Sequence, residues 1–216
     1  DGHREESRLA PHHRCFIRCR RDDDSAFEPF GAEGVFNKFT HLAATFANNY
    51  VTSGGDFTVT GSSLVSLQVD TNVTTDGGDI LFDGTVDGNS ALVLSAGAGA
   101  VSMGDTGLSQ PLTALSVDAA TIDLNDVITI GTQAYTGAVT LNSDYVTTGG
   151  DFTVTGPVLL EVDTIVTTDG GDILFDGTVD GANSLALVAD TGSVTMAADA
   201  GSLERLAALS IDAAAI

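Results

Sequence analysis

The chain has 216 residues, and its 8 Lys and Arg residues against 30 Asp and Glu residues give a formal net charge of −22. Beyond residue 49 the one basic residue is Arg205, which excludes nucleic acid as a partner of that part, because such binding depends on Lys and Arg neutralising phosphates. The same charge is wrong for an anionic membrane surface. No apolar run approaches a length of about 18 residues, so insertion into a membrane is not expected.

Residues 1–47 form a segment of different composition. Residues 1–49 contain seven of the eight basic residues, both cysteines and all four histidines. Within this segment apolar residues recur at spacings of three and four, which predicts a helix over residues 33–47 with one apolar face made of Phe36, Phe39, Leu42, Ala43 and Phe46. We expect this face to cap the end of the repeat region that follows.

From residue 48 onward the chain is repetitive. The sequence TTDGGDILFDGTVDG occupies residues 74–88 and recurs unchanged at residues 167–181, and its flanks match as well, so the unit is 93–95 residues long. We therefore divide the chain into the basic, His- and Cys-containing segment 1–47, a first β-repeat unit 48–144 and a second unit 145–216. The second unit stops before the first unit's end, and we expect the chain to belong to a longer array.

From Tyr50 the chain is expected to consist of short strands, because apolar residues alternate with polar ones between turns of Gly with Asp or Asn. Gly-Gly-Asp ends at Asp56 and at Asp79, 23 residues on, and again at Asp151 and Asp172, 21 residues apart. Such a period predicts an all-β repeat solenoid of the parallel β-helix type. Tandem Ig-like β-sandwiches are the alternative, disfavoured by the absence of Trp, the scarcity of aromatic residues and the lack of cysteines beyond residue 49.

Residues 50–216 resemble the tandem β-strand repeats of large secreted bacterial surface proteins, of the filamentous-haemagglutinin-like and autotransporter-adhesin type. The resemblance is carried by V-T-T-x-G-G-D-[IF], F-D-G-T-V-D-G, G-S-V-T-M and L-x-x-L-S-[VI]-D-A-A-x-I, the last followed in the first unit by D-L-N-D at residues 123–126. It implies a right-handed parallel β-helix, secretion to the outer-membrane-associated cell surface, and a role in adhesion. Residues 1–47 carry no secretion signature of the haemagglutinin type, so the export route is not implied.

Four aspartates are candidate calcium ligands: Asp56, Asp79, Asp151 and Asp172. If Asp56 and Asp79 occupy equivalent places on successive turns of a solenoid, they stack about 4.8 Å apart, and the same holds for Asp151 and Asp172. Like charges at that distance repel, and calcium, which binds carboxylate oxygens in flexible geometry, would remove the repulsion. The turns lack the Gly-Gly-x-Gly-x-Asp repeat of calcium-binding β-rolls, so ordinary solvated turns are the alternative.

Two functions of different classes are therefore expected. The first is a structural or adhesive repeat segment of a secreted bacterial cell-surface protein, whose partners would be a host or neighbouring cell surface or a glycan. The second is a calcium-dependent module that binds carbohydrate or another surface. Beyond residue 49 there is no His or Lys, and the carboxylates lie in repeated turns, so no catalytic residue and no enzymatic activity are predicted.

Overall fold

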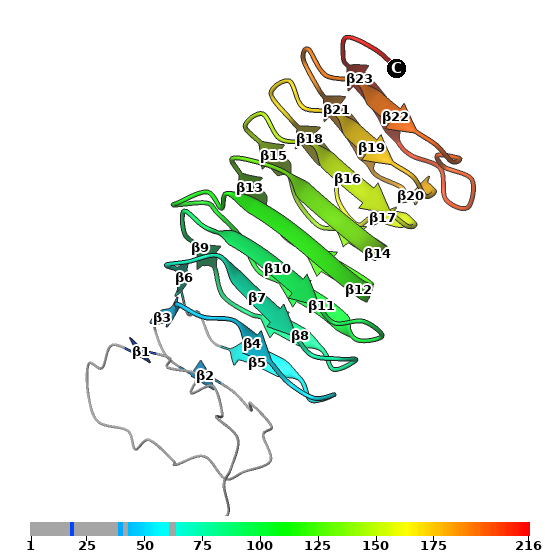
Figure 1. The fold of residues 1–216 in the computed structure, drawn as a ribbon. Helices are drawn as coiled ribbons and strands as arrows, with labels where there is room; N and C mark the ends of the chain where they lie inside the picture. Colours follow the sequence, from blue (N-terminus) through cyan, green and yellow to red (C-terminus); the bar gives the residue numbers. More distant parts are fainter. Residues whose placement is uncertain (1–17, 20–38, 41–42, 61–63) are drawn as a thin grey trace, which may run out of the picture.

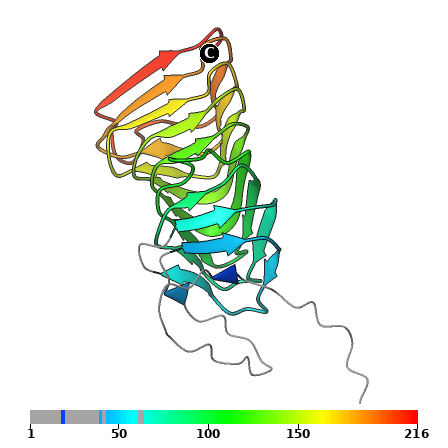
Figure 2. The same cartoon turned by 90° about the vertical axis from the view of Figure 1, so that its left-hand side faces the viewer.

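The computed structural model describes residues 18–19, 39–40, 43–60 and 64–216. The described residues form 23 β-strands and no helix. Every strand pair is parallel except that of β1 (Arg18–Cys19) with β3 (Ala43–Phe46). The strands stack side by side into a rod (Figure 1), and the sequence colours progress steadily along it (Figure 2). The predicted all-β solenoid of parallel strands is thus confirmed, and the parallel pairing excludes tandem Ig-like sandwiches, whose sheets are antiparallel.

Each turn of the solenoid, here called a rung, contributes strand segments to three faces. Face 1 consists of β4 (Tyr50–Val51), β7 (Thr71–Thr74), β10 (Ala91–Ser95), the first part of β12 (Ala114–Leu124), the first part of β14 (Gln133–Leu141), β16 (Phe152–Thr155), β19 (Ile173–Phe175) and β22 (Val194–Met196). Face 2 consists of β2 (Phe39–Thr40), β5 (Phe57–Thr60), β8 (Ile80–Phe82), β11 (Ala100–Met103), the second parts of β12 and β14, β17 (Val158–Leu160) and β20 (Val179–Asp180).

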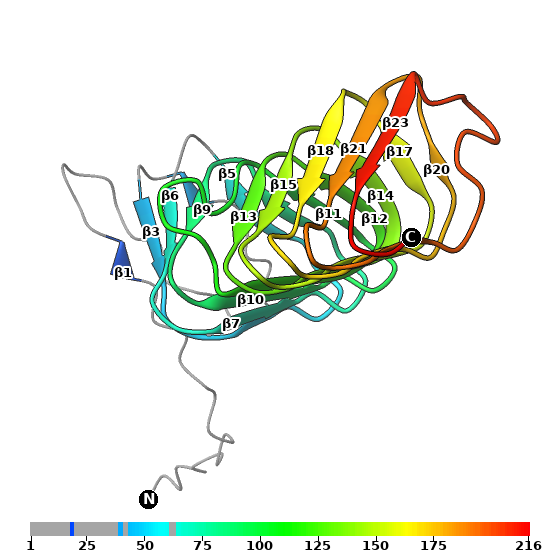
Figure 3. The same ribbon diagram turned by 90° about the horizontal axis from the view of Figure 1, so that it is seen from above.

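Face 3 completes each rung and lies apart from β7 and β10 of face 1 when the rod is seen from above (Figure 3). It consists of β3, β6 (Leu64–Leu67), β9 (Val86–Asp87), a bridge at Thr106, β13 (Val127–Thr129), β15 (Tyr145–Thr147), β18 (Thr164–Thr167), β21 (Ser184–Val188) and β23 (Ala208–Asp212). The hydrogen-bond ladders run along the rod, so each rung satisfies the backbone of the next.

Rung length varies along the rod. On face 2 Phe39 pairs with Val59, Phe57 with Ile80 and Ile80 with Val101, so the first three rungs measured there are 20, 23 and 21 residues long. The shortest rung, between Ile122 and Val139, has 17 residues. It is short because β12 and β14 continue from face 1 into face 2 without a separate turn, with one irregularity in their pairing.

The core is a single apolar column inside the rod. Alternating burial along the strands, as in β10 and β16, directs every second side chain inward. Two aromatic groups repeat within this column: Phe57 lies between Tyr50 and Phe82, with ring centroids 5.6 and 5.8 Å away, and Phe152 lies between Tyr145 and Phe175, both at 5.7 Å. The two sequence copies therefore build the same internal packing.

The two copies nevertheless lie on different faces. Phe57 belongs to face 2, whereas its counterpart Phe152 belongs to face 1; Tyr50 belongs to face 1 and its counterpart Tyr145 to face 3. From β5 to β16 the chain passes through 14 successive face segments, which are four full rungs and two further faces. The repeat unit is therefore not a whole number of rungs, and the second copy is turned by two-thirds of a rung about the rod.

The predicted helix over residues 33–47 is wrong for the described residues within it. Residues 39–40 form β2 and residues 43–46 form β3, which pairs in parallel with β6; residues 33–38 and 41–42 lie outside the described part. Ala44 and Phe46 are buried on either side of the half-buried Thr45, a strand alternation that a short apolar run shares with a helical pattern. Phe46 contacts Tyr50 and Phe57 inside the core, as part of a rung and not of a helical cap.

Candidate functional site

The most repeated feature of the molecule is a turn of sequence Thr-x-Gly-Gly-Asp. It occurs four times, at residues 52–56, 75–79, 147–151 and 168–172. In each, the hydroxyl of the buried threonine donates a hydrogen bond to the carbonyl of the second glycine. In the two turns of identical sequence, at residues 75–79 and 168–172, the Asp-Gly pair after the threonine adopts positive φ at both residues, the conformation that Gly and Asp tolerate best. The motif is thus a tight corner closed by its own threonine.

The four candidate calcium ligands lie in these corners as two pairs, with Asp56 and Asp79 on successive rungs and Asp151 and Asp172 on successive rungs. Oδ1 of Asp56 accepts a hydrogen bond from the backbone N–H of Asp79 at 3.0 Å, and Oδ1 of Asp79 accepts one from Ala100 at 2.8 Å. Oδ1 of Asp151 accepts one from the backbone N–H of Asp172 at 2.9 Å. Each carboxylate therefore satisfies a backbone donor one rung further along the rod.

Asp172 makes the fullest set of these bonds. Its Oδ1 accepts from the backbone N–H of Ser193 at 2.7 Å and from the Ser193 hydroxyl at 2.8 Å. These bonds, the backbone bond first, lower the pKa of Asp172 below its ordinary value of 3.8. Because the folded-state pKa is the lower one, this carboxylate contributes to stability above the ordinary value, and the contribution is lost as the pH falls through the folded-state pKa.

Calcium binding finds no preformed cage in the described part of the chain. Within residues 44–60 and 64–216, no group of three or more His, Cys, Asp or Glu side chains is arranged to hold a metal ion. Asp56, Asp79, Asp151 and Asp172 are all exposed, and the one oxygen that each uses is aimed at a backbone donor. The backbone N–H groups that these carboxylates bind therefore favour a structural role for the four aspartates.

Six further aspartates perform the same task, a role that the sequence did not predict for them. Oδ1 of each accepts a hydrogen bond from a backbone N–H on the following rung: Asp70, Asp87, Asp126, Asp144, Asp163 and Asp180. The bonds of Asp70, Asp144 and Asp163 span 21 residues, one rung. The signal in the sequence was therefore an Asp one rung length before the start of a strand.

Glycines stack behind these corners. A Cβ on Gly78 would lie 2.5 Å from the carbonyl oxygen of Gly55, and one on Gly99 would lie 2.3 Å from that of Gly78. In the second copy a Cβ on Gly171 would lie 2.2 Å from the carbonyl oxygen of Gly150. In the turns at residues 75–79, 147–151 and 168–172 the second glycine of the motif is thus required for the close approach of one rung to the next, and in all four turns the first glycine has positive φ.

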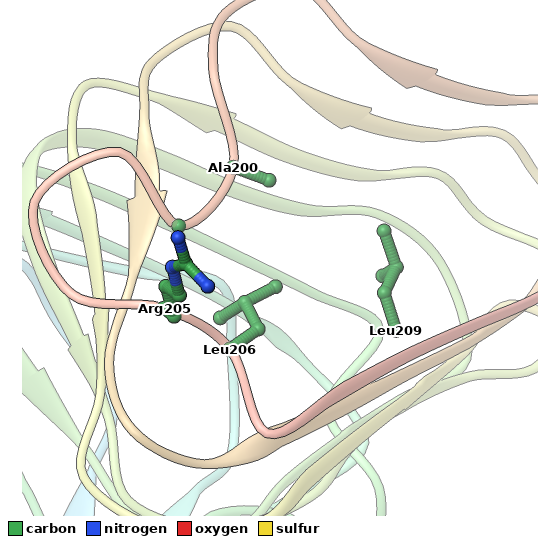
Figure 4. A pocket seen from close by; sticks show the side chains of 5 residues that line it. Ala200, Arg205, Leu206 and Leu209 are labelled. Carbon is green, nitrogen blue, oxygen red and sulfur yellow. The ribbon is translucent and has the colours of Figure 1, made fainter.

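Two shallow hollows mark the surface of the described residues. One, of about 250 Å³, lies at a corner between faces 2 and 3 and is lined by Asp83, Thr85, Asp105, Asn125 and two glycines. The other, of about 350 Å³, lies at the C-terminal end of the rod, where Leu206 lies beside Arg205 and Leu209 lines the hollow further from Arg205 (Figure 4). The first repeats the acidic character of the whole surface, whereas the second is formed largely by apolar side chains.

Comparison with protein-family models, with curated proteins and with solved structures finds no match to this chain. The described residues include no helix with the length and apolar character needed to cross a membrane. The function of the chain is therefore inferred from the geometry of the rod itself.

Proposed function

We propose that the chain is a structural repeat segment of a secreted bacterial cell-surface protein, a rod that spaces or presents adhesive surfaces. The observation that supports this most is the placement of the two identical copies of TTDGGDILFDGTVDG. The first copy runs from β7 through β8 to β9 and the second from β18 through β19 to β20, so the same residues face different sides of the rod. A partner approaching one side would not meet the same surface in both copies.

What the identical residues share is their internal role. Thr75 and Thr168 close their corners in the same way. Asp79 and Asp172 bind the backbone of the next rung in the same way. Sequence identity between the copies thus follows the contacts that build and stack rungs, as expected of a rod whose stability is a sum of repeats and their interfaces.

The charge of the rod supports an extended, solvated structure. Residues 50–216 carry one basic residue and 22 acidic ones, and many of the acids, such as Asp56 and Asp151, lie in exposed corners. A strong net charge of one sign keeps a protein soluble and disfavours association between copies side by side. Alternating inward and outward residues leave Thr and Ser on the faces, together with exposed apolar side chains such as Leu159 and Ile165.

Surface labelling tests the proposal directly. Antibodies raised against residues 50–216 are expected to label intact cells of the source organism, and brief protease treatment of those intact cells is expected to remove the label. A cytoplasmic protein followed in the same samples controls for lysis. Label that becomes accessible only after the cells are broken would rule out a cell-surface rod.

The second candidate, a calcium-dependent binding module, predicts a different thermal behaviour. A ligand at one hundred times its Kd stabilises by about 2.7 kcal/mol, about 5–10 °C in a protein of this size. For a passive rod we expect the same melting temperature in millimolar calcium and in chelator, because the carboxylates already bind backbone donors. The matched control is the variant Asp79→Asn/Asp172→Asn, which keeps an oxygen acceptor and removes two charges. A rise in melting temperature that calcium induces in the unmodified protein and not in this variant would establish the calcium module instead.

A further inference from the structure

The C-terminal end of the rod has a counterpart inside the rod. Ala200, Gly201, Leu206 and Leu209 of the second copy correspond to Thr106, Gly107, Leu112 and Leu115 of the first. The correspondence holds in three dimensions: the backbone N–H of Gly107 donates to the carbonyl of Val86, and that of Gly201 donates to the carbonyl of Val179, both at 2.7 Å.

In the first copy this surface is covered by the next rung. Thr106 pairs with Val127 and Leu112 with Thr129, both in β13. The backbone N–H of Ile128 donates to Thr106 at 2.9 Å and that of Ile130 donates to Leu112 at 2.8 Å. A Cβ on Gly107 would lie 2.1 Å from the carbonyl oxygen of Ile128, so β13 lies in direct contact with this surface.

In the second copy the same surface is open. Leu115 is 0% exposed, whereas its counterpart Leu209 is 44% exposed. Leu112 is fully buried, and its counterpart Leu206 is only half-buried beside the hollow shown in Figure 4. β12 pairs with β10 on one side and β14 on the other, whereas β23 pairs with β21 alone and is the last strand of its face.

We propose that this end, the acceptor face formed by Ala200, Gly201, Leu206, Leu209 and β23, binds one further rung with the sequence type of residues 123–141. The incoming segment adds as parallel strands, a form of β-augmentation. Its Asp-Val-Ile-Thr portion, residues 126–129 in the first copy, fills the hollow as β13 does around Thr106 and Leu112. The occupant is assigned from residues 123–141, which cover the equivalent surface inside the rod, and this assignment does not require that the protein be secreted or adhesive.

The test extends the full chain after Ile216 by the 19 residues found at positions 123–141. Backbone amides of β23 are followed by hydrogen exchange, with an extension of the same residues in scrambled order as control. Tethering gives the added segment a high local concentration at the acceptor face. We therefore expect amide exchange in Ala208–Asp212 to slow by about tenfold or more with the ordered extension and not with the scrambled one. Equal exchange with both extensions would overturn the proposal.

Two substitutions in the extended chain localise the contact. Leu209→Asp places a charge in the acceptor face and is expected to abolish the added protection. Leu203→Asp alters a side chain that is 90% exposed and does not line the hollow, so protection should persist. Circular dichroism melts establish that both variants remain folded. Protection lost equally in both variants would argue against a contact at the hollow.

The competing occupant is a second copy of the whole chain, docked end to end. Light scattering of the unextended protein distinguishes it. We expect a monomer, because the acceptor face fits a single rung and not another completed end. An oligomer that Leu209→Asp dissociates and Leu203→Asp leaves intact would assign the face to a second copy and overturn the proposal.

Discussion

Replacing Gly171 with Ala is expected to cause one of the largest stability losses of any single substitution in the corners. The added Cβ would lie 2.2 Å from the carbonyl oxygen and 2.6 Å from the carbonyl carbon of Gly150 on the neighbouring rung. Both are backbone atoms inside a hydrogen-bonded stack, so relief requires the two rungs to separate. Overpacking of this kind costs about 1–3 kcal/mol or more, and a loss of about 3 kcal/mol lowers the melting temperature by about 6–12 °C in a chain of this length.

The matched control is Gly55→Ala. Gly55 is the second glycine of the first Thr-x-Gly-Gly-Asp motif, yet a Cβ there meets no atom of the described residues within 4 Å, and its φ is not positive. We expect this variant to be neutral or slightly stabilised, because Ala reduces the freedom of the unfolded chain. Thermal and urea melts of the two variants measure the difference. Equal losses in both would show that glycine is required for the corner conformation and not for rung stacking.

The repeat itself made the architecture predictable. Gly-Gly-Asp at Asp56 and Asp79 gave a period of one rung, and the structure pairs the strands that follow, Phe57 with Ile80. The turn of the second copy onto different faces was not predictable, because it depends on how many face segments the unit contains. That number is hidden where β12 and β14 run through a corner without a separate turn between strands.

The roles of the corner residues could not be predicted from the sequence, because they depend on contacts with the neighbouring rung. In the sequence Asp79 is an acidic turn residue, which suggested a cation to neutralise its charge. In the structure its carboxylate accepts a hydrogen bond from the backbone N–H of Ala100, 21 residues away. The helix predicted over residues 33–47 failed for a related reason. β3 is a strand because β6 supplies a parallel partner, and such long-range pairing overrides a local pattern.

A buried polar group lies in the middle of the rod, where the rungs are shortest. Nε2 of Gln133 donates to the carbonyl of Val146 at 2.9 Å and lies 3.2 Å from that of Val127. Its Oε1 accepts from the hydroxyl of Tyr135 at 3.0 Å. Gln133 and Tyr135 are both fully buried, and burial raises the pKa of Tyr135 well above its ordinary value, which keeps the hydroxyl protonated as a donor.

Replacing Gln133 with Leu is therefore expected to destabilise the rod by about 3 kcal/mol or more. The change removes the hydrogen bonds from Nε2 to two carbonyls and leaves the Tyr135 hydroxyl without its acceptor in an apolar column, where a buried polar group without a partner costs about 1–3 kcal/mol. Urea unfolding measures the loss. Gln68→Leu is the control, because Gln68 is exposed and, among the described residues, its side chain bonds only to Ser66 at the surface. This variant should change stability by less than about 0.5 kcal/mol.

Tyr135→Phe separates the hydrogen bond from the shape of the side chain. Alone it leaves Oε1 of Gln133 without its donor and should cost about 1 kcal/mol. Gln133→Leu alone leaves the Tyr135 hydroxyl without an acceptor. The double variant Gln133→Leu/Tyr135→Phe lacks that hydroxyl and so avoids this cost. The two losses should therefore sum to more than the loss of the double variant, with a coupling of about 0.5–3 kcal/mol. Strict additivity would mean that Gln133 stabilises this rung only through the hydrogen bonds of its Nε2 to Val127, Thr129 and Val146.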